Sequence, residues 1–135
     1  MRRATIGLLL LLHMMSGCQQ YGIKNIGVEQ VVDNHNQIEN LDGLNRFIDK
    51  VKKGKEAKVN FVSYGIEGQR MVERLIFNGK QINISASVDG DSIEEYMCKD
   101  IFMKVEETEK KYILSECTGS SGESDGKEIL TVPNE

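Results

Sequence analysis

Five residues of this 135-residue sequence could do chemistry because of their type and position: Cys18, Cys98, Cys117, His35 and Glu73. A thiol can be acylated, oxidised to a disulfide or deprotonated to bind a metal. His35 could act as a general base or a metal ligand if the fold placed a partner beside it, although we favour a capping or turn role. Glu73 falls on the apolar side of a predicted strand, where it could anchor a ligand or partner or lie at the rim of the core.

The first 17 residues are typical of an export signal. A short basic start is followed by an apolar stretch and by two small residues before Cys18. The apolar stretch is too short to span a bilayer stably, as in signal peptides that are removed during export. We therefore predict that residues 1–17 are a signal peptide and that the mature chain begins at Cys18.

The run from Met15 to Cys18 resembles the lipobox of bacterial lipoproteins, although the lipobox usually carries leucine in place of Met15. The resemblance implies that the Cys18 thiol receives a diacylglycerol before cleavage. Two acyl chains on one glycerol give durable anchoring, whereas one chain holds a protein only marginally. We therefore expect an extracytoplasmic protein held on the outer face of the cell membrane through Cys18. The alternative is plain secretion with a free Cys18 thiol.

The charge of the mature chain argues against some partners. The signal peptide holds two of the 17 basic residues and none of the 21 acidic residues, so the mature chain has a net charge of −6. This balance argues against binding to nucleic acid and to anionic lipid headgroups. The lysines from Lys50 to Lys58 form a short, interrupted cluster, which we interpret as the solvated end of a helix.

Two cysteines remain once Cys18 is assigned to lipid. An even pair in an exported domain predicts a disulfide between Cys98 and Cys117, and two buried free thiols are the alternative. A structural zinc site needs four ligands, and His35 is the only histidine of the mature chain. We therefore expect no metal and no cofactor.

Periodicity predicts one helix and five strands. Apolar residues recur at helical spacing up to Val51, Asn40 is a candidate N-cap, and Gly54 is a stop signal, so we expect a helix over residues 41–53. The apolar period then changes to two, which predicts strands over residues 58–64, 70–77, 81–88, 94–106 and 110–117.

Two predicted turns set the strand registers. The Asn78-Gly79 dipeptide suits a two-residue type I′ turn, which would place Glu73 opposite Ile84 on an apolar face. A short loop between the last two strands would place Cys98 opposite Cys117, roughly 4.5 Å apart at Cα and within reach of a disulfide. The neighbouring apolar pairs in this register form the predicted core face, so the disulfide should lie on the opposite, wetter face.

These elements predict a single α+β domain over residues 31–118, in which one N-terminal helix packs on an antiparallel sheet of about five strands. Residues 18–30 are mostly polar and should form a lipid-anchored tether. Residues 119–128 are rich in Gly, Ser, Glu and Asp and show no period, so we expect residues 119–135 to form a flexible acidic tail. The alternative for its end is a short edge strand from Ile129 to Val132.

Several short motifs occur together in this chain: Val32 to His35, Ile38 to Leu41, Tyr64 to Gly68, Asn78-Gly79 and Cys98-Lys99. In these motifs residues 31–118 resemble the domain-of-unknown-function family numbered 4362, found in small lipoproteins of Gram-positive bacilli. The resemblance implies export, the limits of the domain and pairing of the cysteines. It implies no activity, because none has been assigned to the family.

The sequence shows no nucleophile elbow, HExxH, P-loop or paired CxxC motif. We therefore expect a non-enzymatic module that binds a protein or cell-envelope partner. The alternative is a small-ligand carrier or sensor with a groove between helix and sheet, and an enzyme using His35 and Glu73 comes third. A binding module predicts an exposed apolar or sheet-edge patch, a carrier predicts an enclosed cavity, and an enzyme predicts His35 beside a carboxylate.

Overall fold

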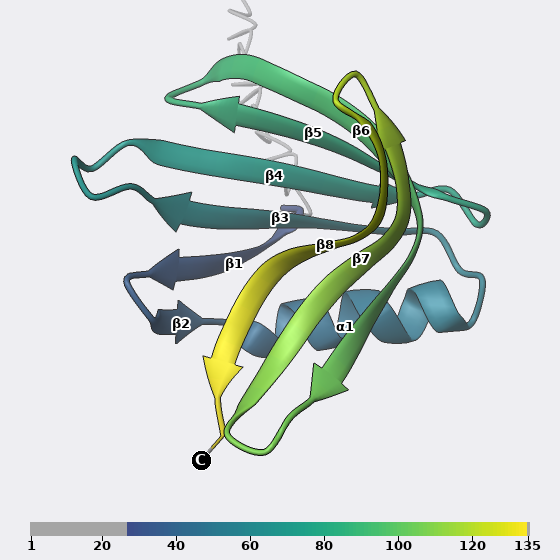
Figure 1. Cartoon of the computed structure of the whole chain (residues 1–135), viewed down its shortest axis with the longest axis horizontal. Helices are drawn as coiled ribbons and strands as arrows, with labels where there is room; N and C mark the ends of the chain where they lie inside the picture. Colours follow the sequence, from purple (N-terminus) through teal and green to yellow (C-terminus); the bar gives the residue numbers. More distant parts are fainter. Residues whose placement is uncertain (1–26, 135) are drawn as a thin grey trace, which may run out of the picture.

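The computed structural model describes residues 27–134, so the predicted signal peptide and Cys18 lie outside the described residues. Within this range the chain forms one helix and eight strands (Figure 1). The elements are β1 (Glu29–Asn34), β2 (Gln37–Glu39), α1 (Leu41–Lys52), β3 (Ala57–Tyr64), β4 (Arg70–Phe77), β5 (Ile82–Val88), β6 (Asp91–Val105), β7 (Glu109–Gly119) and β8 (Gly122–Pro133).

The eight strands form one sheet in the order β2-β1-β3-β4-β5-β6-β7-β8. Neighbouring strands are antiparallel except β1 and β3, which run parallel. The sheet curls into a half-barrel, as expected when strand twist accumulates over a long sheet, and β7 and β8 cross in front of β3 and β4 (Figure 1). The prediction of an α+β fold with about five antiparallel strands is therefore wrong, because the domain is mostly sheet with one short helix.

Strands β1 and β2 lie where the sequence predicted a tether and the approach to the helix. Val31 of β1 is fully buried opposite Phe61 of β3, and α1 makes the crossover that a parallel pair requires. Strand β2 is only three residues long and lies at the sheet edge. Such short strands carry too little alternation to predict. The folded domain therefore begins before residue 31.

The predicted helix is confirmed as α1. Its inward residues Leu44, Phe47, Ile48 and Val51 are buried and pack against the concave face of the sheet in the main core. Asn40 precedes the helix but does not cap it with its side chain. Its Nδ2 atom instead donates to the Gln30 carbonyl oxygen at 2.9 Å, which ties the start of α1 to β1.

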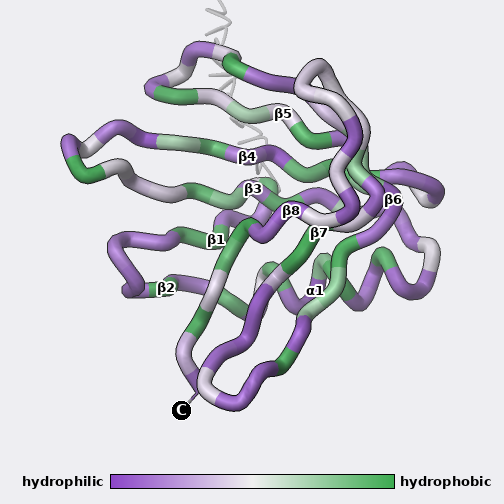
Figure 2. The backbone as a smooth tube through the Cα atoms, viewed as in Figure 1, coloured by the Kyte–Doolittle hydropathy of each residue, from purple (hydrophilic) through white to green (hydrophobic). Residues whose placement is uncertain are grey.

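Strand β8 corrects the prediction of a flexible tail over residues 119–135. Residues 122–133 pair with β7, and Leu130 is 4% exposed in the core. The first half of the strand is coloured hydrophilic or neutral and only the second half hydrophobic (Figure 2). An edge strand that is exposed over most of its length has no apolar alternation, so the composition of β8 alone predicts disorder.

The register predicted for β4 and β5 is wrong by two residues. Asn78 accepts hydrogen bonds from the backbone N–H groups of Lys80 and Gln81 through its Oδ1 atom, both at 3.0 Å. This closes a four-residue loop in place of the predicted two-residue turn. Glu73 consequently lies opposite Ala86 and not Ile84, although a shift of two residues keeps its side chain on the same face.

The register predicted for β6 and β7 is confirmed. Cys98 lies opposite Cys117, and the structure joins them in a disulfide with 2.04 Å between the sulfur atoms and 4.0 Å between the Cα atoms. The adjacent ion pair between Lys99 and Glu116 measures 2.7 Å.

The disulfide lies in the core, so the prediction of a wetter face is wrong. Cys98 and Cys117 are 2% and 5% exposed, and Leu114 is fully buried with them. Strict alternation would put Leu114 and Cys117 on opposite faces, because they are three residues apart. Glu116 has a left-handed φ of 50°, and the burial pattern of both strands changes phase beside it. This irregularity turns both cysteines inward.

Candidate functional site

Two β-bulges, one in β6 and one in β8, place isoleucines at one cleft of the curled sheet. In β6, Ile93 is the extra residue where the pairing with β5 shifts after Ala86. In β8, Ile129 is the extra residue where the pairing with β7 shifts after Tyr112. Bulges re-aim side chains and are common beside functional sites. Both isoleucines line the same cavity.

This cavity, called the cleft below, has a volume of about 260 Å³ and is lined only by strand residues. Its apolar floor includes Phe61 and Ala86, which are 4% and 7% exposed. Met71 and Ile93 also line it and are 38% and 62% exposed, so they form its rim. The cleft therefore presents apolar side chains to solvent over a buried apolar floor.

A charged cluster lies in the wall of the cleft. The Tyr96 hydroxyl donates to Glu73 Oε1 at 3.1 Å, and Lys127 Nζ lies 3.2 Å from the same oxygen. Lys127 Nζ also lies 2.8 Å from the Tyr96 hydroxyl oxygen and 4.1 Å from the ring centroid. Because Glu73 belongs to β4 and Lys127 to β8, these contacts join strands that are four places apart in the strand order of the sheet.

A second cavity of about 270 Å³ adjoins the cleft and shares Glu94 and Lys127 with it. Ser121, in the β7–β8 turn, donates from Oγ to Glu94 Oε1 at 2.8 Å. Helix α1 lines neither cavity, because its apolar face is buried in the core. These two hollows therefore lie between strands, whereas the alternative of a ligand carrier predicted a groove between helix and sheet. A further hollow is lined by residues of both α1 and the sheet.

Burial, followed by the neighbouring Glu73 carboxylate, raises the pKa of Tyr96 far above its ordinary value. An unfolded tyrosine ionises near pH 10, so above that pH the unfolded chain loses a proton that folded Tyr96 keeps. We expect the contribution of Tyr96 to stability to be complete below pH 10 and to be lost as the pH rises further. Denaturant unfolding from pH 8 to pH 11 should show a steeper loss for the wild type than for Tyr96→Phe, and parallel curves would contradict this expectation.

The Glu73–Lys127 pair should stabilise the closed sheet modestly. The Lys127 side chain is 39% exposed and Glu73 19%, so water screens part of the attraction. We expect Lys127→Met and Glu73→Gln each to lower the free energy of unfolding by about 1 kcal/mol, and the double variant to lose less than the sum. Denaturant titration of all four proteins measures this coupling. Lys104→Met, which removes a more exposed ion pair to Glu106, is the control and should lose less.

The structure does not bring His35 to Glu73. His35 and Asn36 form the turn between β1 and β2, with left-handed φ angles of 52° and 71°. Asp33 Oδ1 accepts a hydrogen bond from the backbone N–H of Asn36 at 2.9 Å, and His35 is exposed. His35 thus has a turn position, while Glu73 contacts Tyr96 and Lys127.

Other features of the described residues bear on the predicted sites. No group of three or more metal-ligating side chains occurs within residues 27–134. The single helix in that range is neither long nor apolar enough to cross a membrane. Cys18, the predicted site of lipidation, is outside it.

Sequence patterns did not point to Tyr96 or Lys127. Tyr96 sits in a predicted strand but gains its role from Glu73, a residue 23 positions earlier in the chain. Lys127 lies among acidic residues and glycines in the segment that reads as a tail. The one available signal was Glu73 itself, a charge on an otherwise apolar strand face, which requires a partner when it is half-buried.

Residues 28–113 match the model of a family described as a domain of unknown function (DUF4362). Neither the curated proteins nor the solved structures contain a match to the chain. The matched segment begins just before β1 and ends inside β7, so Cys117 and Lys127 lie beyond it. Since the match covers more than half of the sequence and agrees with the motifs, the chain belongs to the DUF4362 family of domains of unknown function.

Proposed function

We propose that this protein is an extracytoplasmic lipoprotein, held on the outer face of the cell membrane by a diacylglycerol on Cys18. We propose further that it is a non-enzymatic binding module whose contact site is the cleft. The signal-like residues 1–17 and the cysteine that follows them support the anchor. The Cys98–Cys117 disulfide supports export, because disulfides persist mainly outside the reducing cytoplasm.

The observation that carries the binding proposal is the exposed apolar rim of the cleft. Met71 and Ile93 are exposed at its mouth, and Ile93 is placed there by a bulge. An exposed apolar patch above a hollow is typical of a site that a partner covers. We therefore propose that a protein or cell-envelope partner inserts an apolar side chain into the cleft.

Charge narrows the chemistry of that partner. Glu73, Glu94 and Glu128 line the cleft, and Lys127 is the one cationic side chain among its lining residues. Lys127 is already paired with Glu73. The remaining negative charge favours a partner that carries a basic group beside the apolar side chain.

Contacts within the charged cluster argue for binding and against catalysis. Glu73 Oε1 accepts hydrogen bonds from Tyr96 and Lys127, and these contacts tie β4 to β6 and β8. The raised pKa of Tyr96 keeps its hydroxyl protonated, which makes it a poor nucleophile. His35 lies in a turn away from these groups.

Site-specific photo-crosslinking in intact cells tests the binding proposal. A photo-reactive p-benzoylphenylalanine replaces Ile93 in one protein and Val105 in another, because these residues are equally exposed, at 62% and 61%, and only Ile93 lines the cleft. We expect a discrete adduct from position 93 that is absent from position 105 and is lost when Met71→Asp is added. The same adducts from both positions, or none from position 93, would contradict the proposal.

A small-ligand carrier or sensor is the second candidate, and the adjoining cavity of about 270 Å³ favours it. In that case the ligand would occupy the cleft and its neighbour, between strands. Native mass spectrometry of the protein extracted from membranes should then show a retained small molecule. Such a mass, together with no crosslink from position 93, would select the carrier over the binding module.

A further inference from the structure

Six exposed lysines gather at one end of the domain although they come from two separate segments. The last turn of α1, the loop after it and the start of β3 supply five of them, and the β4–β5 loop supplies the sixth. The two segments approach closely, since a Cβ atom on Gly79 would lie 3.6 Å from the carbonyl oxygen of Gly54. The six are Lys50, Lys52, Lys53, Lys55, Lys58 and Lys80, called the lysine-rich end below.

The lysine-rich end keeps its positive charge. Among the described residues none of these six lysines takes part in an ion pair. The acidic residues within the first segment are Asp49 and Glu56, and Asp100 lines the same hollow as Lys52 and Lys80. Six lysines and three carboxylates therefore leave a local charge of +3. This is opposite in sign to the charge of the whole chain, which is −4.

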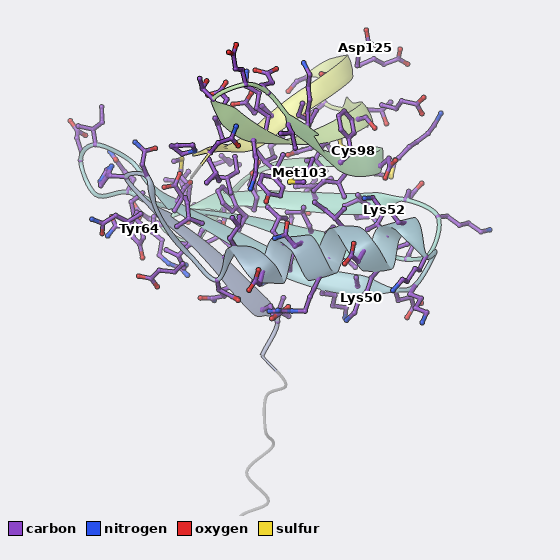
Figure 3. All side chains as sticks on the ribbon, turned by 90° about the horizontal axis from the view of Figure 1, so that it is seen from below. Lys50, Lys52, Tyr64, Cys98, Met103 and Asp125 are labelled. Carbon is purple, nitrogen blue, oxygen red and sulfur yellow. A yellow bond between two sulfur atoms is a disulfide. The ribbon has the colours of Figure 1, made fainter. Side chains whose placement is uncertain are left out.

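The acidic residues that outweigh these lysines lie partly at the far end of the sheet. Asp33 lies near the end of β1, beside the β1–β2 turn, and Glu67 lies in the β3–β4 loop. Asp89 lies in the β5–β6 turn, and Asp91 follows that turn as the first residue of β6. Figure 3 shows Lys52 toward one end of the domain and Tyr64, the last residue of β3, toward the other. The eight residues of β3 span roughly 26 Å, whereas the Debye length is about 8 Å at physiological salt. A surface near the lysines is therefore screened from these distant carboxylates.

The entry of the chain allows this end to reach the membrane. Glu29, where β1 begins, pairs with Val59 near the start of β3, and β1 then runs parallel to β3, away from the lysines. Nine residues precede the first described residue, Gly27, in the proposed mature chain. They are residues 18–26, and the first of them is the proposed anchor, Cys18. Fully extended they span at most about 32 Å, so Gly27 stays within that distance of the anchor.

We propose that the lysine-rich end docks on the anionic lipid headgroups of the membrane that carries the anchor. Juxtamembrane lysines are attracted by such headgroups, and the short tether keeps them within range. Docking turns the cleft outward, because Met71 and Ile93 lie beside the turns at the opposite end of the sheet. This differs from the expectation drawn from the net charge, which argued against anionic headgroups, because Lys80 is far from the other five lysines in the linear sequence and only the fold adds it to them. This inference rests on the proposed lipid anchor.

Amine footprinting of the lipidated protein in vesicles tests the docking. The protein is reconstituted in phosphatidylcholine vesicles and in vesicles that also contain phosphatidylglycerol, and acetylation of each lysine is followed by mass spectrometry. We expect Lys52, Lys53, Lys55 and Lys80 to react several-fold more slowly on the anionic vesicles, and high salt to remove the difference. Lys110, at the tip of the β6–β7 hairpin, should react equally on both.

A matched pair of variants separates docking from nonspecific attraction. Each lysine near an anionic surface contributes about fivefold in binding. Lys53→Gln/Lys55→Gln should therefore restore most of the reactivity of Lys80 on anionic vesicles. Lys104→Gln/Lys110→Gln removes the same charge elsewhere and should restore none of it. Equal reactivity of Lys80 on both kinds of vesicle would overturn the proposal.

Two further outcomes distinguish failure of the docking from failure of the anchor. Intact mass shows whether the protein carries a diacylglycerol; if it does not, the anchor is rejected and flotation of the unlipidated chain with the same vesicles tests docking alone. Flotation only with phosphatidylglycerol would support docking, and no flotation would overturn it. Protection of the lysines by a soluble anionic phosphate polymer but not by anionic vesicles would also overturn lipid docking.

Discussion

Ending the chain after Gly119 should abolish stable folding. The truncation removes β8, and with it Leu130, which is 4% exposed in the core, and Ile129 and Val132, which pack against that core. Full burial of a large apolar side chain contributes about 1.5–3 kcal/mol, so the loss should reach about 5 kcal/mol or more. That is comparable to the total stability of a small domain. Far-ultraviolet circular dichroism and denaturant titration measure the effect.

Two point variants on β8 provide the graded control. Leu130→Ala should lower the free energy of unfolding by about 2–4 kcal/mol, because Leu130 is almost fully buried. Glu123→Ala on the same strand changes an exposed side chain and should stay within about 0.5 kcal/mol of the wild type. A truncated chain with the unfolding midpoint of the intact protein would mean that residues 122–133 are the flexible tail that composition suggests.

Removing the disulfide should be the second large loss. Cys98 and Cys117 are 19 positions apart, and in the chain-entropy model closing a loop of this length stabilises the folded state by roughly 3 kcal/mol. For a domain of about 100 residues this corresponds to a decrease in Tm of roughly 15 °C. We expect Cys98→Ala/Cys117→Ala to show this decrease in calorimetry while keeping the far-ultraviolet spectrum of the wild type.

Reductant supplies the control for the disulfide prediction. It should lower the Tm of the wild type toward that of the double variant and leave the double variant unchanged. Because both cysteines are buried, reduction of the native protein should be slow until the domain opens. A Tm within about 3 °C of the wild type in the double variant would show that the sheet register alone holds the two strands.

Local pattern was sufficient to predict elements whose two faces differ in polarity. The helix α1 and the strands β3 to β7 each bury one face, so their periods appear in the sequence. The opposition of Cys98 and Cys117 followed from the length of one hairpin loop. Strand β8 was not predicted because its first half has no buried apolar residue. Strand β2 was not predicted because three residues are too few to show a period.

Long-range features could not be predicted, because they depend on how the sheet curls. The inward turn of the disulfide depends on the left-handed φ of Glu116, a backbone choice that a glutamate does not reveal. The cleft depends on bulges at Ile93 and Ile129 that no turn signal marks. Glu73 was singled out as a charge on an apolar face, but its partner Lys127 comes from the strand that was not predicted.

We propose that a domain closed by the Cys98–Cys117 disulfide is tethered to the outside of the membrane through Cys18. Intact mass of the protein extracted from membranes, measured after thiol alkylation with and without prior reduction, tests it most directly. We expect a chain that starts at Cys18, carries a diacylglycerol, takes no alkyl group before reduction and takes two after it. A chain without lipid whose thiols react before reduction would contradict both the anchor and the disulfide.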